Sequence, residues 1–193
     1  MTAARAALVD HGIDHVRVAV LADRLGVARS SFYWYFADRD ELAEALLEQW
    51  QVTNTSSLLE RCARRSTTIT EAMFAVFECW ADPALFDVPL EFAVREWARR
   101  DDTVRQRLAD ADRERIGAIA ALHRRHGYPA GEALVRARVQ YHSQIGMYAL
   151  GIHESTADRL RMVRDYVKVF TGVEPSAAEL QGFRRRVRSY GKE

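Results

Sequence analysis

The sequence predicts an all-α fold, with an N-terminal three-helix head that contains a helix-turn-helix and a larger helical bundle after it. The chain of 193 residues is rich in Ala, Leu, Arg and Glu, which favour helix, and it holds only 10 Gly and 4 Pro. Apolar residues recur at helical spacing, and no stretch alternates apolar and polar residues as a half-buried strand does. The segment from Leu21 to Phe36 has the pattern of two short helices joined by a turn at Gly26.

The charge and the cysteine content narrow the classes of function. The net charge is +1, and the first fifty residues hold five Arg against eight Asp and Glu. Since phosphate neutralisation supplies nonspecific DNA affinity, a DNA-binding head here must gather its few arginines on one face. Cys62 and Cys79 are too few for a disulfide framework or a zinc site, which predicts reduced thiols in a cytoplasmic protein. No apolar run approaches the ~20 residues that cross a membrane.

The head is predicted as three helices. The first covers residues 2–11 and stops at Gly12, a residue that favours a helix C-terminus. The second runs over 18–25, with Leu21, Ala22 and Leu25 as its apolar stripe. The third covers 28–35, where Phe32 and Phe36 stand four residues apart and share one face. We expect these two rings to fill the small core of the head.

A long helix over residues 38–52 follows, because Asp38 and Glu41 form a pattern like a capping box. The sequence predicts the DNA-binding domain as residues 1–45, and a helical effector-binding and dimerisation domain as residues 46–193. Pro83, Pro89 and the stretch 127–131 separate the helices of that second domain. They are predicted over 69–80, 91–100, 103–126, 132–152 and 156–170, with a last basic helix from 176.

The start of the third helix is the candidate surface for a DNA major groove, because a recognition helix presents its N-terminal residues to base edges. Five consecutive aromatic residues cannot all point inward on one helix, so three of them are free to contact phosphate and sugar. Two arginines near helix starts favour phosphate as well. The candidate DNA-binding residues are Arg17, Ala28, Arg29, Ser30, Ser31, Tyr33, Trp34, Tyr35 and Arg39.

From Val18 to Leu42 the sequence resembles the TetR family of bacterial transcriptional regulators. The resemblance rests on Leu21-Ala22, Gly26-Val27, the aromatic block 32–36 and the run 38–42. It implies a regulator, most often a ligand-responsive repressor, that binds a palindromic DNA operator as a homodimer. The chain departs from the family in three places. Val16 and Arg17 stand where a threonine is usual, Trp34 replaces a frequent histidine, and members usually have residues ahead of the first helix. We therefore expect residues upstream of Met1 to belong to the head.

The resemblance also implies that the larger domain binds a small organic effector and forms the dimer. Aromatic residues near the middle of the chain and on the most apolar late helix fit a pocket, although ordinary core packing explains such residues equally well. The candidate ligand-binding residues are Phe77, Trp80, Phe92, Trp97, Tyr141, Gln144, Met147 and Tyr148. The two helices over 132–152 and 156–170 are the expected dimer interface, through Leu134, Tyr141, Tyr148, Leu160, Val163 and Val167.

Two other functions stay open. An enzyme is the first, because His123 and His126 are three residues apart on a helix and could share a metal. No third ligand, nucleophile elbow, phosphate loop or carboxylate pair accompanies them, so we expect no catalysis, no metal and no cofactor. The second is a helical small-molecule-binding dimer with weak or lost DNA binding. In the favoured hypothesis, an effector moves the helix over 38–52 and changes the spacing of the two heads.

Overall fold

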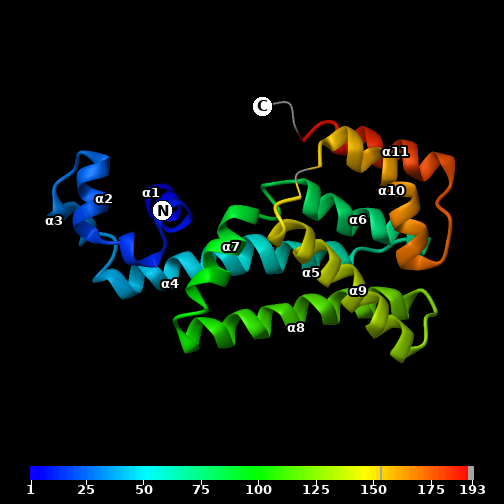
Figure 1. Ribbon diagram of the computed structural model, residues 1–193, viewed down its shortest axis with the longest axis horizontal. Helices are drawn as coiled ribbons and strands as arrows, with labels where there is room; N and C mark the ends of the chain where they lie inside the picture. Colours follow the sequence, from blue (N-terminus) through cyan, green and yellow to red (C-terminus); the bar gives the residue numbers. More distant parts are fainter. Residues whose placement is uncertain (153, 191–193) are drawn as a thin grey trace. The chain divides into compact units, whose positions relative to one another are not determined.

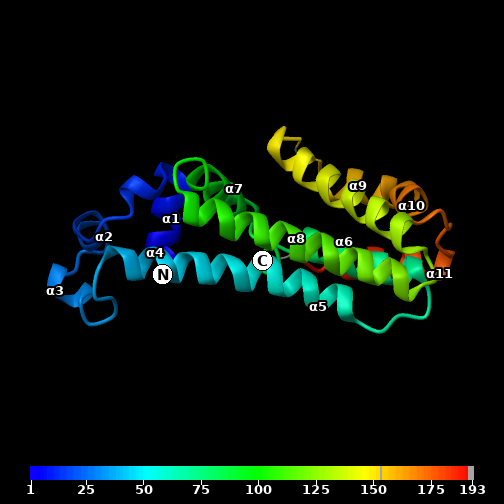
Figure 2. The same cartoon turned by 90° about the horizontal axis from the view of Figure 1, so that it is seen from below.

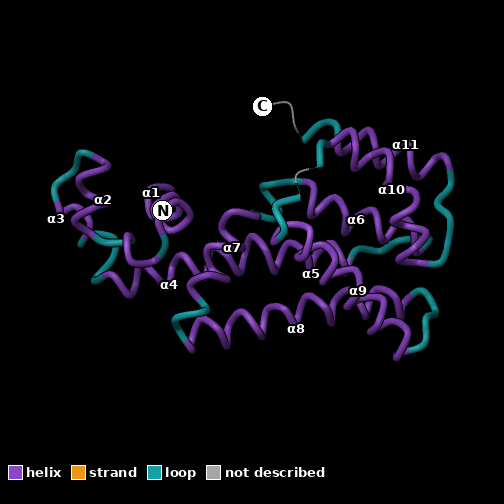
Figure 3. Tube along the Cα trace, viewed as in Figure 1, coloured by secondary structure: helices purple, strands orange, loops and turns teal. Residues whose placement is uncertain are grey.

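The computed structural model describes residues 1–152 and 154–190, and every regular element within these ranges is helical (Figures 1 and 3). The predicted all-α fold is therefore confirmed. Within the same ranges, no helix combines the length and the apolar character that a membrane span requires.

Contacts divide the chain into two compact units. Unit 1 comprises Met1–Asn54 and Asp87–Ala111, and unit 2 comprises Thr55–Phe86 and Asp112–Glu193. The chain therefore passes between the units three times. These units are defined by contacts between residues and not by function. The functional domains 1–45 and 46–193 therefore stay a prediction.

Unit 1 is built around α1 (Thr2–His11), which contacts helices on three sides. Its partners are α2 (Val18–Leu25), α4 (Arg39–Trp50) and α7 (Val88–Trp97). A 3-10 turn, η1 (Ile13–His15), a short α3 (Arg29–Phe32) and the first part of α8 (Asp102–Arg125) complete the unit. The core is apolar and includes Leu8, Val16, Leu46, Trp50, Leu90 and Val94.

Unit 2 is organised by α6 (Ile69–Ala81), which contacts α5 (Ser57–Ala63), α10 (Thr156–Thr171) and α11 (Ala177–Val187). The second part of α8 and α9 (Ala130–Ala149) also belong to this unit, and α9 runs beside α10 (Figure 2). A π-helical segment, η2 (Gln51–Ser56), continues α4 into α5. Side-chain caps at Thr68, Ser155 and Ser176 fix the starts of α6, α10 and α11.

The predicted helix bounds differ from the observed ones mainly at three places. The helix predicted over 38–52 does not end there, because α4, η2 and α5 form a continuous helical run to Ala63. The third helix is shorter than predicted because the chain turns at Tyr33–Tyr35 instead of continuing as helix. The helix predicted over 91–100 begins earlier, since the Asp87 carboxylate caps Leu90 N and a proline occupies the first turn. The turn η1 was not predicted from the sequence.

Candidate functional site

The helix-turn-helix of the head is closed by Gly26. This residue has φ 64° and ψ 30°, a left-handed conformation that glycine adopts without the steric cost of a Cβ. The backbone N–H of Gly26 donates to Asp23 O, and that of Val27 donates to Ala22 O. Ala28 is extended, and α3 begins at the next residue. The turn seen in the sequence therefore places the start of α3 on the surface.

The aromatic block after this turn divides into core and surface residues. Phe32 and Phe36 pack against the core of unit 1, with ring centroids 5.3 Å apart. Tyr33, Trp34 and Tyr35 are 59%, 86% and 79% exposed. These three neighbouring aromatic side chains therefore form an exposed, largely apolar surface on the head.

Most of the other predicted DNA-binding residues are exposed, and Arg17 stands at the opposite end of α2 from the turn. Ala28, Arg29 and Ser30 are exposed, and Ser31 is half-buried. Arg17 is exposed and donates from Nε to the Asp14 carbonyl at 2.6 Å. The candidates from Ala28 to Tyr35 are thus neighbours in the chain, whereas Arg17 stands before α2.

Arg39 has a structural task that the sequence did not reveal. Its Nε donates to Val16 O and its Nη2 to Ile13 O, both at 2.9 Å. The side chain thereby ties the start of α4 to the segment that leads into α2. A guanidinium has five N–H donors, so Arg39 retains donors for a phosphate while it holds this loop.

Several acidic groups of the head are engaged elsewhere. Asp10 pairs with Arg24 at 3.8 Å, Asp14 with Arg100 at 3.7 Å, and Glu44 with Arg107 at 2.6 Å. Asp38 and Glu41 cap the start of α4, where Asp38 Oδ1 accepts from Glu41 N at 2.8 Å. Arg100 and Arg107 lie outside the first fifty residues, so they offset two of the acidic charges there, whereas the Asp10–Arg24 pair leaves the local balance unchanged.

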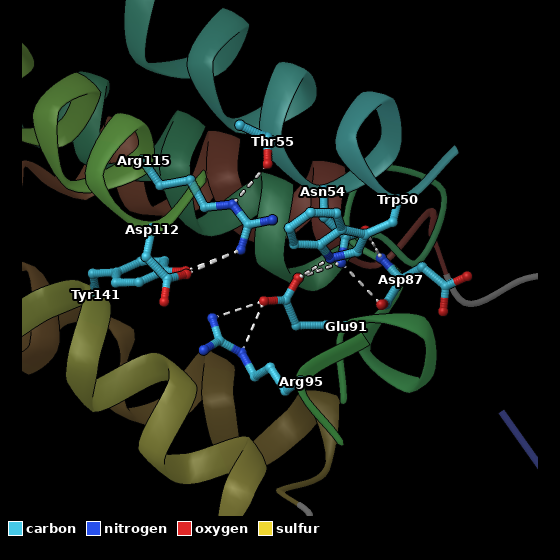
Figure 4. Close-up of polar contacts among 9 residues, drawn as sticks. All are labelled: Trp50, Asn54, Thr55, Asp87, Glu91, Arg95, Asp112, Arg115 and Tyr141. Atoms are coloured by element: carbon cyan, nitrogen blue, oxygen red, sulfur yellow. Dashed lines mark hydrogen bonds and ion pairs between the residues drawn. The ribbon is translucent and has the colours of Figure 1, made fainter. Parts of the chain in front are cut away.

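A polar cluster lies between α4, η2 and α7 of unit 1, and its members Trp50, Asn54 and Glu91 are buried (Figure 4). Glu91 accepts hydrogen bonds from Trp50 Nε1 at 2.7 Å and Asn54 Nδ2 at 2.9 Å, and it pairs with Arg95 at 2.8 Å. Asp87 binds both Nε and Nη2 of Arg5, at 2.5 and 2.6 Å. Sequence reasoning missed this cluster. Its only signal was acidic residues within apolar segments, which is also the pattern of ordinary amphipathic helices.

A second polar cluster lies in unit 2 around the fully buried Arg115. Its Nε donates to Thr55 Oγ1 at 2.9 Å and its Nη1 to Tyr141 Oη at 3.0 Å (Figure 4). Tyr141 in turn donates to Asp112 Oδ1 at 2.6 Å. Tyr141, which the sequence proposed for the ligand and for the dimer, is 1% exposed and serves this interior network.

Unit 2 also contains a cavity of about 280 Å³ between α6, α9, α10 and α11. Four of the predicted ligand-binding residues line it, namely Phe77, Trp80, Gln144 and Met147. Leu160 and Val163, predicted for the dimer, line it as well. The lining is mostly aromatic and aliphatic, as in sites for small organic ligands.

The remaining candidates lie elsewhere. Phe92 and Trp97 belong to α7 of unit 1 and do not line the cavity. Tyr148 stacks on Phe86 and donates to Trp80 O at 3.0 Å, and it is not among the residues that line the cavity. Val167 is fully buried inside the single chain, whereas Leu134 is 37% exposed. Side chains that are buried in one copy are core residues, so a dimer contact requires their exposed neighbours.

His123 and His126, the pair that suggested an enzyme, have different surroundings. His123 is fully buried, and burial is the main reason that its pKa is lowered to about 4. His126 Nε2 lies 2.9 Å from Ser66 Oγ. Within residues 1–152 and 154–190, no group of three potential metal ligands occurs.

Comparison with known families places the head. Residues 1–46 match the family model described as bacterial regulatory proteins, tetR family. The matched segment contains α1, the helix-turn-helix and more than half of α4. Neither the curated proteins nor the solved structures gave a match to this chain.

Proposed function

We propose that this chain, which belongs to the tetR family of bacterial DNA-binding transcriptional regulators, is a ligand-responsive repressor that binds a palindromic operator as a homodimer. The single observation that carries the DNA contact is the exposed aromatic surface of Tyr33, Trp34 and Tyr35 beside the start of α3. In the proposal, α3 enters the major groove and these three side chains contact the flanking sugar-phosphate backbone.

Within α3, base readout is assigned to Arg29. Its exposed guanidinium can bind the O6 and N7 atoms of guanine in bidentate fashion, which is worth ~1–3 kcal/mol of discrimination. Ser30 and Ser31 contribute shorter hydrogen-bonding side chains. Arg17 and Arg39 are assigned to phosphates at the edges of the site.

The homodimer is proposed to form through the outer faces of α9 and α10. Val135 and Val139 are 59% and 51% exposed on α9, and Met162 and Val169 are 41% and 71% exposed on α10. Such apolar exposure on two neighbouring helices is typical of a surface that a second copy covers. Two heads on one operator must meet successive major grooves, about 34 Å apart.

The cavity of unit 2 is the proposed effector site. The chain passes from unit 1 to unit 2 within the helical run 39–63 and again within α8. An effector that prefers one arrangement of the heads would weaken operator binding, and a 100-fold loss of DNA affinity corresponds to ~2.7 kcal/mol of coupling.

A footprint on the DNA that flanks the gene of this protein tests the proposal. We expect two protected half-sites related by a near two-fold axis and spaced by about one helical turn. The double variant Val135→Glu, Val139→Glu should be monomeric in sedimentation and should lose the footprint. A protein that is monomeric as wild type, or that protects one half-site only, would contradict the proposed dimer.

A further inference from the structure

The chain passes between the two units at three peptide bonds, which are Asn54–Thr55, Phe86–Asp87 and Ala111–Asp112. Thr55, Phe86 and Asp112 are therefore the residues of unit 2 at which the chain enters or leaves this unit. We call these three the crossing residues. A single side chain of unit 2, that of Arg115, contacts all of them.

The three contacts of Arg115 differ in kind. Its Nε donates to Thr55 Oγ1 at 2.9 Å, and its Nη1 lies 3.7 Å from Asp112 Oδ1 (Figure 4). Its Cζ lies 5.7 Å from the centre of the Phe86 ring, within reach of a cation–π contact. Because Arg115 is 0% exposed, its charged guanidinium depends on partners inside the protein. Arg115 thereby ties together three crossing residues that are far apart in the sequence.

In unit 1, the residues next to two of these crossings are tied to α1. Asp87 N donates to Asn54 Oδ1 at 2.8 Å, and Asn54 Nδ2 donates to Asp87 O at 3.0 Å (Figure 4). The Asp87 carboxylate accepts from Arg5 of α1 at 2.5 and 2.6 Å. The first helix of the head is thus bonded to Asp87 and, through Asp87, to Asn54.

A series of contacts inside unit 2 leads from Arg115 to the effector cavity. Phe86 stacks with Tyr148, with ring centroids 6.1 Å apart, and the Tyr148 hydroxyl donates to Trp80 O at 3.0 Å. Trp80 lines the cavity, whereas Arg115 is not among the lining residues. Close-packed interiors transmit strain between neighbouring side chains. A change at Trp80 can therefore reach Arg115 through the rings of Tyr148 and Phe86.

The first crossing lies within the π-helical segment η2. Asn54 and Thr55 are consecutive in it and are 0% and 1% exposed. The Asn54 side chain is hydrogen-bonded to residues of unit 1, and the Thr55 hydroxyl accepts from Arg115 of unit 2. Single π-helical turns are rare and occur frequently at functional sites. The rare turn thus coincides with the point at which the chain leaves unit 1.

Resting on the proposed function, we propose that Arg115 is the positioning residue through which the effector cavity controls the head. Arg115 touches neither effector nor DNA. It fixes the three crossing residues, and the peptide bonds at the crossings carry this constraint into unit 1, where Asp87 and Asn54 hold α1. An effector that displaces Trp80 or Tyr148 acts on the head by loosening the grip of Arg115 on the crossing residues.

Hydrogen exchange followed by mass spectrometry tests the proposal without a ligand. Thr55→Val removes one acceptor of Arg115 at nearly constant side-chain volume. We expect the backbone amides of α1 to exchange about 3-fold faster or more in this variant, because α1 opens more often when the crossing is less fixed. This response lies in unit 1, whereas the lost hydrogen bond lies in unit 2.

Thr70→Val is the matched control. Thr70 is 2% exposed on α6 of unit 2 and donates to Glu179 Oε1 at 2.7 Å, so this variant also loses a buried hydroxyl. Its α1 amides should exchange as in the wild-type protein. Equal acceleration of α1 in both variants would reveal a general loss of stability, and no acceleration in Thr55→Val would show that the crossing does not act on α1. Either result would overturn the proposal.

A double-mutant cycle tests the route from the cavity. Tyr148→Phe removes the hydrogen bond to Trp80 O at the cavity wall, and we expect it to change the exchange rate of α1 about 2-fold or more. In the Thr55→Val background the same change should have less than about half of this effect, because the contact to the crossing is already lost. Additive effects, or no response of α1 to Tyr148→Phe, would refute the route.

Arg115→Met removes all three contacts at once and should accelerate exchange in α1 more than Thr55→Val does. Arg61→Met is its control, because the Arg61 side chain is 15% exposed and pairs with Glu78 inside unit 2. Acceleration of α1 by Arg61→Met to the same extent would contradict a special role of Arg115. If Arg115→Met does not fold, Thr55→Val decides alone.

Binding to the DNA that flanks the gene separates this inference from the proposed function. Thr55→Val should weaken this binding about 5-fold or more, since a less fixed head pays more ordering free energy on binding. A wild-type protein that binds no DNA, with α1 still responding to Thr55→Val, would refute the proposed function and support the coupling. Specific DNA binding that is equal in wild type and Thr55→Val, with α1 exchange unchanged, would support the regulator and refute the role of Arg115.

Discussion

The indole nitrogen of Trp50 donates a hydrogen bond of 2.7 Å to Glu91, and the two side chains are 1% and 0% exposed (Figure 4). Glu91 also accepts from Asn54 and pairs with Arg95. Such a buried carboxylate adds little net stability when all its partners are present, but its removal takes one acceptor from each of Trp50, Asn54 and Arg95. This hydrogen bond links α4 to α7 within unit 1.

Replacement of this carboxylate should therefore destabilise the protein strongly. Glu91→Leu is expected to lower the free energy of unfolding by about 3–5 kcal/mol in urea titrations, since Trp50, Asn54 and Arg95 lose their common acceptor. Glu96→Gln, also on α7, is the control, because Glu96 is 60% exposed and should change stability by less than ~1 kcal/mol. Equal effects of both changes would show that burial of Glu91 is unimportant.

The exposed aromatic residues should matter for DNA and not for folding. Trp34→Ala is expected to reduce operator affinity roughly 10-fold or more in a dimer, which loses the contact twice. Because Trp34 is 86% exposed, the melting temperature of the variant should stay close to that of the wild-type protein. Phe32→Ala, by contrast, should lower the melting temperature, because it removes packing against the core of unit 1. A Trp34 variant with unchanged affinity would remove this residue from the interface.

The buried His123 predicts acid sensitivity. Its pKa is lowered to about 4, chiefly by burial, so the unfolded chain binds the proton more readily than the folded one. Above the unfolded pKa of about 6.5, this histidine leaves the free energy of unfolding unchanged. As the pH falls from there to about 4, the free energy of unfolding decreases by ~3 kcal/mol in total. His123→Phe should flatten this part of the stability profile, whereas His142→Gln, at an exposed site on α9, should not. Parallel profiles for wild type and His123→Phe would contradict the assignment.

The two cysteines should be inert in the folded protein. Burial is the main cause that raises the pKa of Cys62 and of Cys79 to about 12, so the thiolate is scarce at pH 8. A chromogenic disulfide reagent is expected to react with neither thiol under native conditions and with both in denaturant. Rapid reaction of either thiol in the native protein would show that unit 2 opens locally.

The head could be predicted closely because its signals are local. The glycine turn, the cap at Asp38 and the spacing of Phe32 and Phe36 each act within a few residues. The exact end of α3 could not be predicted, since residues 33–35 contain no glycine or proline to mark the turn that follows Phe32.

The larger domain was less predictable because its site depends on packing between distant segments. Phe77, Trp80, Gln144 and Met147 do line the cavity. Arg159 and Gln140, however, gave no signal, because a polar residue on an amphipathic helix is usually on its solvent face. Phe92 and Trp97 showed the same aromatic pattern but belong to unit 1. Aromatic content thus indicates burial without saying which core receives the ring.

Equilibrium binding of the purified protein to the DNA that flanks its gene, compared with a scrambled fragment of equal length over a range of salt concentrations, tests the central claim most directly. We predict tight binding to the flanking DNA, at least about 10³-fold tighter than to the scrambled fragment, with affinity that falls steeply as salt rises. Equal affinity for both fragments, or no binding to either at low salt, would contradict a sequence-specific regulator.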